Sequence, residues 1–162
     1  MAVISFTGVD QPYGWLGNMA PFRIDYLGQR WLTSEALFQS MRYDDLNVRE
    51  LIRIEKSPMS AKMVAKSKKY NKLIVVKPCS PEDLDNMRLC IRLKFEQNPV
   101  IKEKLKKTFP HEIVEDVTKR NSGARHDFWG ARNKGGVWTG QNHMGKLLME
   151  LRDVFLEEDL KS

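Results

Sequence analysis

The sequence contains few cysteines and no long apolar segment. Its two cysteines, Cys79 and Cys90, match neither the spacing of a metal site nor a disulfide framework. The longest apolar runs, such as residues 73–76, are far shorter than the roughly 18 residues that a membrane-spanning helix needs. The N-terminus also lacks the basic and apolar regions of a secretory signal. We therefore expect a cytoplasmic protein with reduced thiols and no membrane partner.

The signatures of several enzyme classes are also absent. The three histidines, His111, His126 and His143, do not form a zinc-binding pattern. The sequence holds no catalytic triad, phosphate-binding loop or dinucleotide-binding fingerprint. It therefore predicts neither a metal nor a cofactor, and composition and spacing alone do not name a reaction.

The composition predicts one folded domain over residues 1–162. Hydrophobic residues make up 41% of the chain and charged residues 30%, and a chain of this length can bury roughly two-thirds of the surface that it exposes when unfolded. The 27 lysines and arginines exceed the 21 acidic residues, which gives a formal charge of +6. This charge favours anionic partners such as nucleic acid, nucleotides or phosphorylated metabolites. A generic basic surface is the equal alternative.

The apolar periodicity predicts a mainly helical α+β fold with a small N-terminal β element. Residues 22–32 alternate between apolar and polar side chains, which predicts a hairpin. Capping residues, with proline at the first helical position in two cases, mark the helix starts. The predicted helices cover residues 33–44, 47–56, 80–98, 99–108 and 141–157, and another begins at residue 57.

The least regular segment, residues 118–141, is the first candidate binding site. It is rich in glycine, and residues 119–134 hold five lysines and arginines against a single acid, Asp127. Long ordered loops in compact domains are often functional. Trp129 in this segment either stacks on a base or fills the core. We therefore expect much of the surplus positive charge to lie here.

Polar side chains at three places break the pattern of an ordinary helical domain. Glu35, Gln39 and Arg42 share one helix face, either as a solvated strip or as a cleft lining in which a carboxylate is held by an amide and a guanidinium. Lys94 lies within the apolar face of the helix over residues 80–98, where it snorkels, pairs with an acid or enters a pocket that lowers its pKa. Asn142 is a natural N-cap for the last helix.

Several motifs, taken in order along the chain, resemble those of the NADAR family, which includes the YbiA-like N-glycosidases. They are L-G-N-M-A-P at residues 16–21, T-S-E-A-L-F-Q at 33–39, S-P with A-K at 57–62, M followed by K-F-E-Q-N-P over 87–99, F-W-G at 128–130 and G-Q-N-H-M-G-K-L-L-M-E-L-R at 140–152. The resemblance covers nearly the whole chain in the order and spacing of the family.

This resemblance implies a YbiA-like α+β fold and hydrolysis of the C–N bond between ribose and a base. The implied substrate is ADP-ribose attached to guanine in nucleic acid or nucleotides. One alternative is a phosphorylated ribosylamino-pyrimidine of the riboflavin pathway. The other is a non-catalytic module that binds ADP-ribose or nucleic acid.

For cleavage of a ribosyl C–N bond, we predict that Glu35 and Lys94 are the catalytic residues. Glu35 stabilises the ribosyl cation or orients a water molecule, and Gln39 and Arg42 hold it in place. Lys94 captures the opened ribose as a Schiff base or contacts a phosphate.

The substrate contacts that we predict for this reaction come from both halves of the chain. They are Asn18, Gln39, Arg42, Trp129, Gly130, Arg132 and Asn142. Trp129 stacks on the leaving base, and Asn18 and Asn142 hold ribose hydroxyls. Arg132 binds phosphate together with Arg125 and Lys134.

The chain departs from the family pattern at Cys79-Ser80, which replaces a tryptophan-aspartate pair, and at three single positions. Ala36 stands in place of a histidine, Arg42 in place of a lysine and Ala131 in place of an acid. Because a guanidinium does not form a Schiff base, a covalent role for Arg42 is excluded. These departures are the main support for the non-catalytic alternative.

Overall fold

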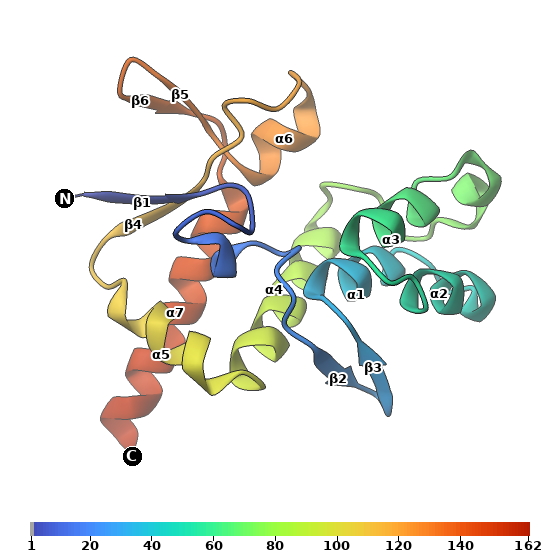
Figure 1. Ribbon diagram of the computed structural model, residues 1–162, viewed down its shortest axis with the longest axis horizontal. Coiled ribbons are helices and arrows are strands. Elements are labelled where there is room, and N and C mark those ends of the chain that lie inside the picture. The colour runs from blue at the N-terminus through green and yellow to red at the C-terminus, as the bar shows by residue number, and fades with distance from the viewer. Residues whose placement is uncertain (1) are drawn as a thin grey trace. The chain divides into compact units, whose positions relative to one another are not determined.

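The computed structural model describes residues 2–162, and its contacts divide the chain into two compact units. One unit is Asn18–Asn98, and the other combines Met1–Gly17 with Pro99–Ser162. Both units mix helices with short strands, so the α+β class is confirmed (Figure 1). One domain over residues 1–162 stays a prediction.

The Asn18–Asn98 unit opens with the predicted hairpin. Strand β2 (Ile24–Tyr26) pairs antiparallel with β3 (Gln29–Trp31). The two turn residues between them, Leu27 and Gly28, both have positive φ, at 50° and 78°. Two consecutive left-handed residues suit the right-handed twist of the flanking strands.

Four α-helices and a 3₁₀ helix complete this unit. They are α1 (Ser34–Ser40), α2 (Leu46–Arg53), α3 (Pro58–Ala65), η2 (Lys68–Leu73) and α4 (Pro81–Glu96). A side-chain oxygen caps the first turn of each α-helix, as the sequence predicts for α3 and α4. Helix α1 packs against α2, α3 and α4, and all seven of its residues are buried.

Helix α1 ends at Ser40, short of the predicted end at residue 44. The carbonyl of Arg42 accepts a hydrogen bond from the Val75 amide at 2.8 Å, and Tyr43 forms a β-bridge with Ile74. The backbone after Ser40 therefore bonds to a distant segment instead of continuing the helix.

The other unit is built around two parallel strands and a long helix. Strand β1 (Val3–Phe6) pairs with β4 (Glu112–Glu115), and helix α7 (His143–Lys161) packs against β4 and α5 (Pro99–Lys107). The short 3₁₀ helix η1 (Gly14–Leu16) also belongs here. Alternate side chains of β1 are buried, which explains the short apolar run at the start of the sequence.

Residues 118–141 are more regular than the sequence predicted. They contain helix α6 (Ala124–Trp129) and a hairpin of β5 (Arg132–Lys134) and β6 (Val137–Thr139). Gly135 and Gly136 form its turn with φ of 59° and 87°. The expectation of an irregular loop was wrong, because a Gly-Gly pair between two short strands is itself a hairpin signal. Among residues 2–162, no helix has the length and apolarity to cross a membrane.

Candidate active site

Glu35 on α1 is a buried carboxylate whose two oxygens are both held by amide donors. Gln39 Nε2 donates to Glu35 Oε1 at 2.8 Å, and Asn18 Nδ2 donates to Oε2 at 2.9 Å. Only 8% of Glu35 is exposed. One donor on each oxygen fixes the plane of the carboxylate without neutralising its charge. The expected contact between Gln39 and Glu35 is present.

Asn18 is itself held at the start of α1. Ser34 Oγ donates to the Asn18 carbonyl at 3.0 Å and also to Asn18 Oδ1, and the Glu35 amide donates to the same carbonyl at 3.1 Å. With its Oδ1 accepting from Ser34, the Asn18 side chain turns its NH₂ group toward Glu35. A contact between Asn18 and ribose stays a prediction.

Arg42 reaches Glu35 only through Gln39. Its Nε and Nη2 donate to the two carboxylate oxygens of Asp83 at 2.9 and 2.8 Å, and its Nη1 donates to Gln39 Oε1 at 3.3 Å. The direct contact with Glu35 expected from the helix spacing was wrong, because the guanidinium pairs with a carboxylate on α4 instead. Arg42 thus orients the Gln39 amide, and Gln39 orients Glu35.

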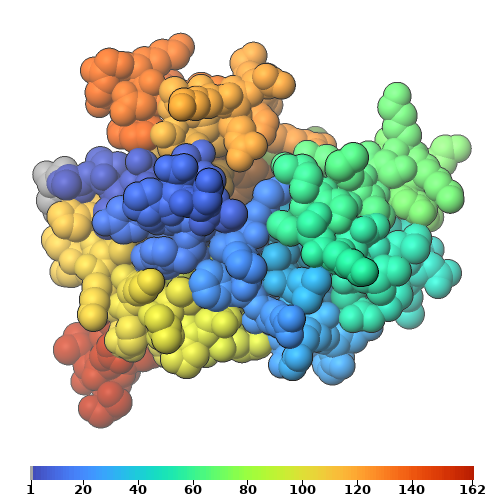
Figure 2. All heavy atoms as spheres, viewed as in Figure 1, coloured from blue at the N-terminus to red at the C-terminus, as the bar shows by residue number. Residues whose placement is uncertain are grey.

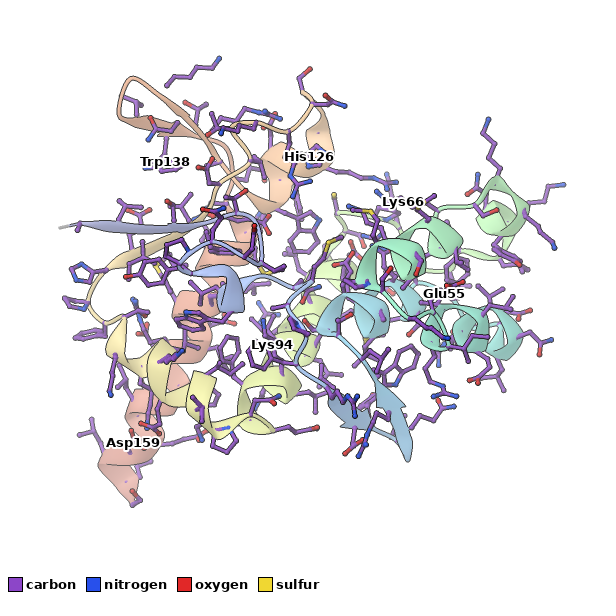
Figure 3. All side chains as sticks on the ribbon, in the orientation of Figure 1. Glu55, Lys66, Lys94, His126, Trp138 and Asp159 are labelled. Atoms are coloured by element: carbon purple, nitrogen blue, oxygen red, sulfur yellow. The ribbon has the colours of Figure 1, made fainter. Side chains whose placement is uncertain are left out.

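Lys94 lies in the interior on α4 (Figure 3). Its side chain is 1% exposed, so it does not snorkel to solvent. Burial lowers the pKa of Lys94 to about 7, which leaves a substantial share of neutral amine at neutral pH. Its Nζ lies 5.5 Å from the ring centre of Phe22 and 5.2 Å from that of Phe95.

Cys90 lies one turn before Lys94 on α4 and is fully buried. Burial raises the pKa of the Cys90 thiol, and the charges of Glu35 and Asp83 raise it further. Both carboxylates are therefore close enough to act on this face of α4.

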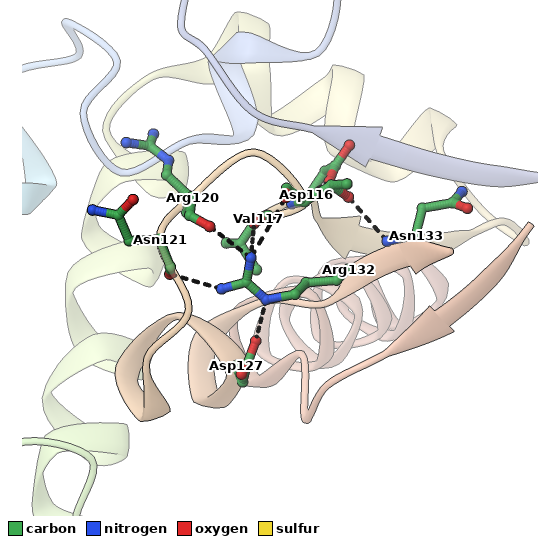
Figure 4. Close-up of polar contacts among 8 residues, drawn as sticks. Asp116, Val117, Arg120, Asn121, Asp127, Arg132 and Asn133 are labelled. Carbon is green, nitrogen blue, oxygen red and sulfur yellow. Dashed lines mark hydrogen bonds and ion pairs between the residues drawn. The ribbon is translucent and has the colours of Figure 1, made fainter. Parts of the chain in front are cut away.

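Arg132, predicted to bind phosphate, organises its own loop in the other unit (Figure 4). Its Nε pairs with Asp127 at 2.8 Å. Its Nη1 donates to the carbonyls of Val117 and Arg120 at 2.9 and 2.7 Å, and its Nη2 donates to that of Asn121 at 2.8 Å. All three guanidinium nitrogens have protein partners, so phosphate binding by Arg132 stays a prediction.

Asn142 is the N-cap residue of α7, as the sequence predicts, and its carbonyl accepts from the Lys146 amide at 3.0 Å. Its side chain, however, joins the start of α7 to strand β4. The Oδ1 accepts from the Glu115 amide at 3.0 Å, and the Nδ2 donates to the Ile113 carbonyl at 2.9 Å. The side chain therefore makes no capping hydrogen bond to its own helix.

Gly130 and Trp129 lie at the end of α6. A Cβ atom on Gly130 would lie 2.5 Å from the Glu115 carbonyl oxygen, so this close backbone approach requires glycine. Trp129 is half-buried and meets Phe128 edge to face, with 4.9 Å between the ring centres.

The predicted site residues fall into two groups, one in each compact unit. Asn18, Glu35, Gln39, Arg42 and Lys94 belong to one unit, and Trp129, Gly130, Arg132 and Asn142 belong to the other.

Comparison with known proteins decides the family. The NADAR domain matches residues 5–156. The chain belongs to the NADAR family. The resemblance seen in the motifs is confirmed.

Relatives of this NADAR chain carry enzyme names. It is 33% identical over 151 residues to N-glycosidase YbiA of Escherichia coli, which covers 93% of the chain and 87% of that protein. An N-glycosidase of Nostoc punctiforme is 28% identical over 163 residues, covering 93% and 90%. A riboflavin biosynthesis protein of Vibrio vulnificus is 27% identical over 155 residues, covering 95% of the chain but 39% of that protein.

The NADAR fold is confirmed by a solved structure. The NMR structure of Escherichia coli YbiA matches with a TM-score of 0.81 and 33% identity, over 99% of this chain and 88% of that one. The YbiA-like α+β fold is therefore correct.

Sequence reasoning about this NADAR domain missed Asp83, which is fully buried. Its amide donates to the capping Ser80 Oγ at 3.2 Å, and its Oδ2 also accepts from the Cys79 amide at 2.9 Å. The motif at residues 80–83 predicts a helix start and so accounts for an acid there. Nothing in the linear pattern relates Asp83 to Arg42, which lies 41 residues away.

The NADAR site thus offers a fixed negative charge and a buried amine of low pKa on two packed helices. Among residues 2–162, no group of histidine, cysteine and acidic side chains is arranged to hold a metal ion. The chemistry available from these side chains is electrostatic stabilisation, proton transfer and nucleophilic attack.

Proposed function

We propose that this chain is an N-glycosidase that releases ADP-ribose from guanine in nucleic acid or nucleotides. At the level of reaction class, its family and its named relatives support a hydrolase acting on N-glycosyl compounds. The observation that carries the proposal is Glu35, a buried carboxylate held at both oxygens by Gln39 and Asn18.

Cleavage of a ribosyl C–N bond develops positive charge at the anomeric carbon as the base departs with the bonding electron pair. Glu35 stabilises this charge. Because its carboxylate is already oriented by two amides, it needs no rearrangement as the charge appears. Arg42 and Asp83 maintain that orientation through Gln39.

Lys94 supplies the nucleophile in this proposal. Its neutral amine attacks the anomeric carbon, and the departing base takes up a proton. The ribose ring opens as the amine loses its proton and an imine forms at that carbon. Addition of water then releases the ribose product and restores the amine. The low pKa of Lys94 favours the first step.

The residues predicted in the other unit stay predictions. Trp129 is predicted to stack on a base, and Asn142 and Arg132 are predicted to contact ribose and phosphate, although both of these side chains already bond to protein groups. Arg125 and Lys134, both exposed, are the remaining predicted phosphate contacts.

A second candidate substrate is a phosphorylated ribosylamino-pyrimidine. The observation that favours it is the relative from Vibrio vulnificus that is named a riboflavin biosynthesis protein. The same Glu35 and Lys94 chemistry applies, since this compound also carries a ribosyl C–N bond.

One experiment separates these candidates. The purified protein is incubated with ADP-ribosylated DNA and, in parallel, with a ribosylamino-pyrimidine phosphate, and released products are followed by chromatography. We expect free ADP-ribose and restored guanine from the DNA, with slower turnover of the pyrimidine. Faster turnover of the pyrimidine contradicts the assigned substrate. Binding of ADP-ribosylated DNA without any product contradicts the enzyme and supports the non-catalytic module.

A further inference from the structure

The segment from Lys56 to Pro81 carries the positive surplus of the whole chain. It holds seven lysines and no acidic residue, whereas the rest of the chain holds 20 lysines and arginines and 21 acidic residues. The candidate loop over residues 119–134 is therefore not the main source of net charge. Part of that loop's charge is also bound internally, through the contacts of Arg132 with Asp127 and four carbonyls.

The lysines of this segment are presented to solvent. Six of the seven are exposed, and Lys62 is half-buried. Lys68, Lys69 and Lys72 lie on η2, and no carboxylate in the described part of the chain forms an ion pair with them. Figure 2 shows this segment, in green, projecting from its unit, and Figure 3 shows nitrogen-tipped side chains pointing outward from it. We call Lys68, Lys69 and Lys72 the lysine surface.

The segment that carries the lysine surface is hydrogen-bonded to Arg42, Tyr43 and Asp83. Before η2, the Ala65 carbonyl accepts a hydrogen bond from the Tyr43 hydroxyl. After η2, the Val75 amide donates to the Arg42 carbonyl at 2.8 Å, and the Cys79 amide donates to Asp83 Oδ2 at 2.9 Å. A partner lying along the lysine surface is thus positioned on the same unit as Glu35.

We infer that the lysine surface binds the phosphate backbone of a nucleic acid strand and holds a polymeric substrate on the unit that contains Glu35. This inference rests on the proposed function and narrows its substrate class, from any ADP-ribosylated guanine to guanine within a nucleic acid. Closely spaced lysines match the repeating negative charge of a phosphate backbone, whose binding releases condensed counterions.

The composition of η2 favours a nucleic acid over a lipid surface. Tyr70 stands among the lysines, with Lys69 Nζ 5.6 Å from its ring centre. An aromatic ring between cationic side chains is the arrangement on which single-stranded bases stack. A membrane-binding segment needs instead a continuous amphipathic helix with an apolar face, and η2 is a six-residue 3₁₀ helix with no buried residue.

The test compares two variants that carry the same change in charge. K68E/K69E/K72E reverses the lysine surface, and K107E/K146E/K161E reverses three exposed lysines of the other unit that have no assigned contact with substrate. Binding of an unmodified, fluorescein-labelled 20-nucleotide single-stranded DNA is measured by fluorescence anisotropy over a range of KCl concentrations. Circular dichroism and the unfolding midpoint establish that both variants are folded.

We expect K68E/K69E/K72E to bind at least about tenfold more weakly than the wild type. The slope of log affinity against log salt should fall by about 2, since each phosphate contact on a single strand contributes about 0.7. K107E/K146E/K161E should retain most of the affinity and the slope. An equal or larger loss in this control variant overturns the inference.

Two further measurements separate this inference from the proposed function and from a membrane role. K68E/K69E/K72E should raise KM for ADP-ribosylated DNA and leave kcat/KM for ADP-ribosylated guanosine within twofold of the wild type. Absence of turnover in every form refutes the proposed function, whereas the anisotropy result with unmodified DNA still tests the surface. The wild type is also tested for cosedimentation with vesicles that contain phosphatidylserine. If it binds these vesicles more tightly than it binds DNA, and K68E/K69E/K72E loses this binding, the assignment to nucleic acid is overturned.

Discussion

At the scale of single residues, the acidic side chain of Glu35 and the basic side chain of Lys94 are both buried in the same unit. Glu35 is a buried carboxylate whose two oxygens accept hydrogen bonds from amides, whereas the pKa of Lys94 is lowered because burial penalises the ammonium. The sequence identified both residues. Whether each side chain is solvated or buried, which the sequence left open, follows from the helices packed around them.

Replacing Glu35 with glutamine tests the electrostatic role. E35Q keeps the shape of the side chain, removes the charge and should reduce kcat at least about a hundredfold. The matched control is E55Q, in which a half-buried acid of the same unit is neutralised, and its activity should equal that of the wild type. Activity of E35Q within a few-fold of wild type, measured with ADP-ribosylated DNA, contradicts the proposed role.

The amine of Lys94 should leave a signature in the pH dependence. With the pKa lowered to about 7 by burial, kcat should rise with pH through an apparent pKa near 7 as the neutral amine forms. K94R stays charged at every pH tested and should be inactive. Borohydride added during turnover should give a covalent adduct on the wild type, detected by intact mass, and none on K94R. Turnover without an adduct contradicts the covalent step.

At the scale of elements, the Arg42–Asp83 ion pair joins the chain after α1 to the first turn of α4. Both side chains are almost fully buried, and such pairs contribute less to stability than their geometry suggests because desolvation opposes the attraction. The pair does more than link two helices, since Nη1 of Arg42 also orients Gln39.

An apolar replacement separates these two functions of the pair. D83N leaves a buried guanidinium without its carboxylate and should lower the free energy of unfolding by about 3–5 kcal/mol. The double variant R42M/D83L should recover most of this stability in urea denaturation, because packed apolar side chains replace buried charges. Its kcat should stay reduced, because nothing orients Gln39 and Glu35. Full recovery of kcat in R42M/D83L contradicts the positioning role.

At the scale of the whole molecule, charge is divided unevenly along the chain. The surplus predicted from composition is real, but its main location is the segment around η2 instead of the loop that contains Trp129. The capping motifs in this segment predict where helices begin, and they indicate nothing about the lysines between them. The absence of acidic residues from residues 56–81, beside seven lysines, is the sequence feature that identifies this segment as the source of the surplus.

The buried Lys94 should also make the stability of the whole molecule depend on pH. Because its folded pKa of about 7 lies below its ordinary value of 10.5, the unfolded chain binds more protons between these values, and stability rises with pH. We expect the free energy of unfolding of the wild type to increase from pH 7 to 8.5 relative to that of K94M. Urea titrations at each pH measure this, and parallel curves for the two proteins contradict it.

The sequence alone determined the starts of helices α1–α5 and α7, the first hairpin, the reaction class through its motifs and the helix face shared by Glu35 and Gln39. These features depend on residues within a few positions of one another, where capping, turn geometry and helical spacing act directly. Only the tertiary structure decided that Asp83 pairs with Arg42, that Asn142 bonds to β4 and that Lys94 is desolvated. Each of these depends on contacts between elements distant in sequence, and burial, hydrogen-bond partners and pKa are properties of that packed environment.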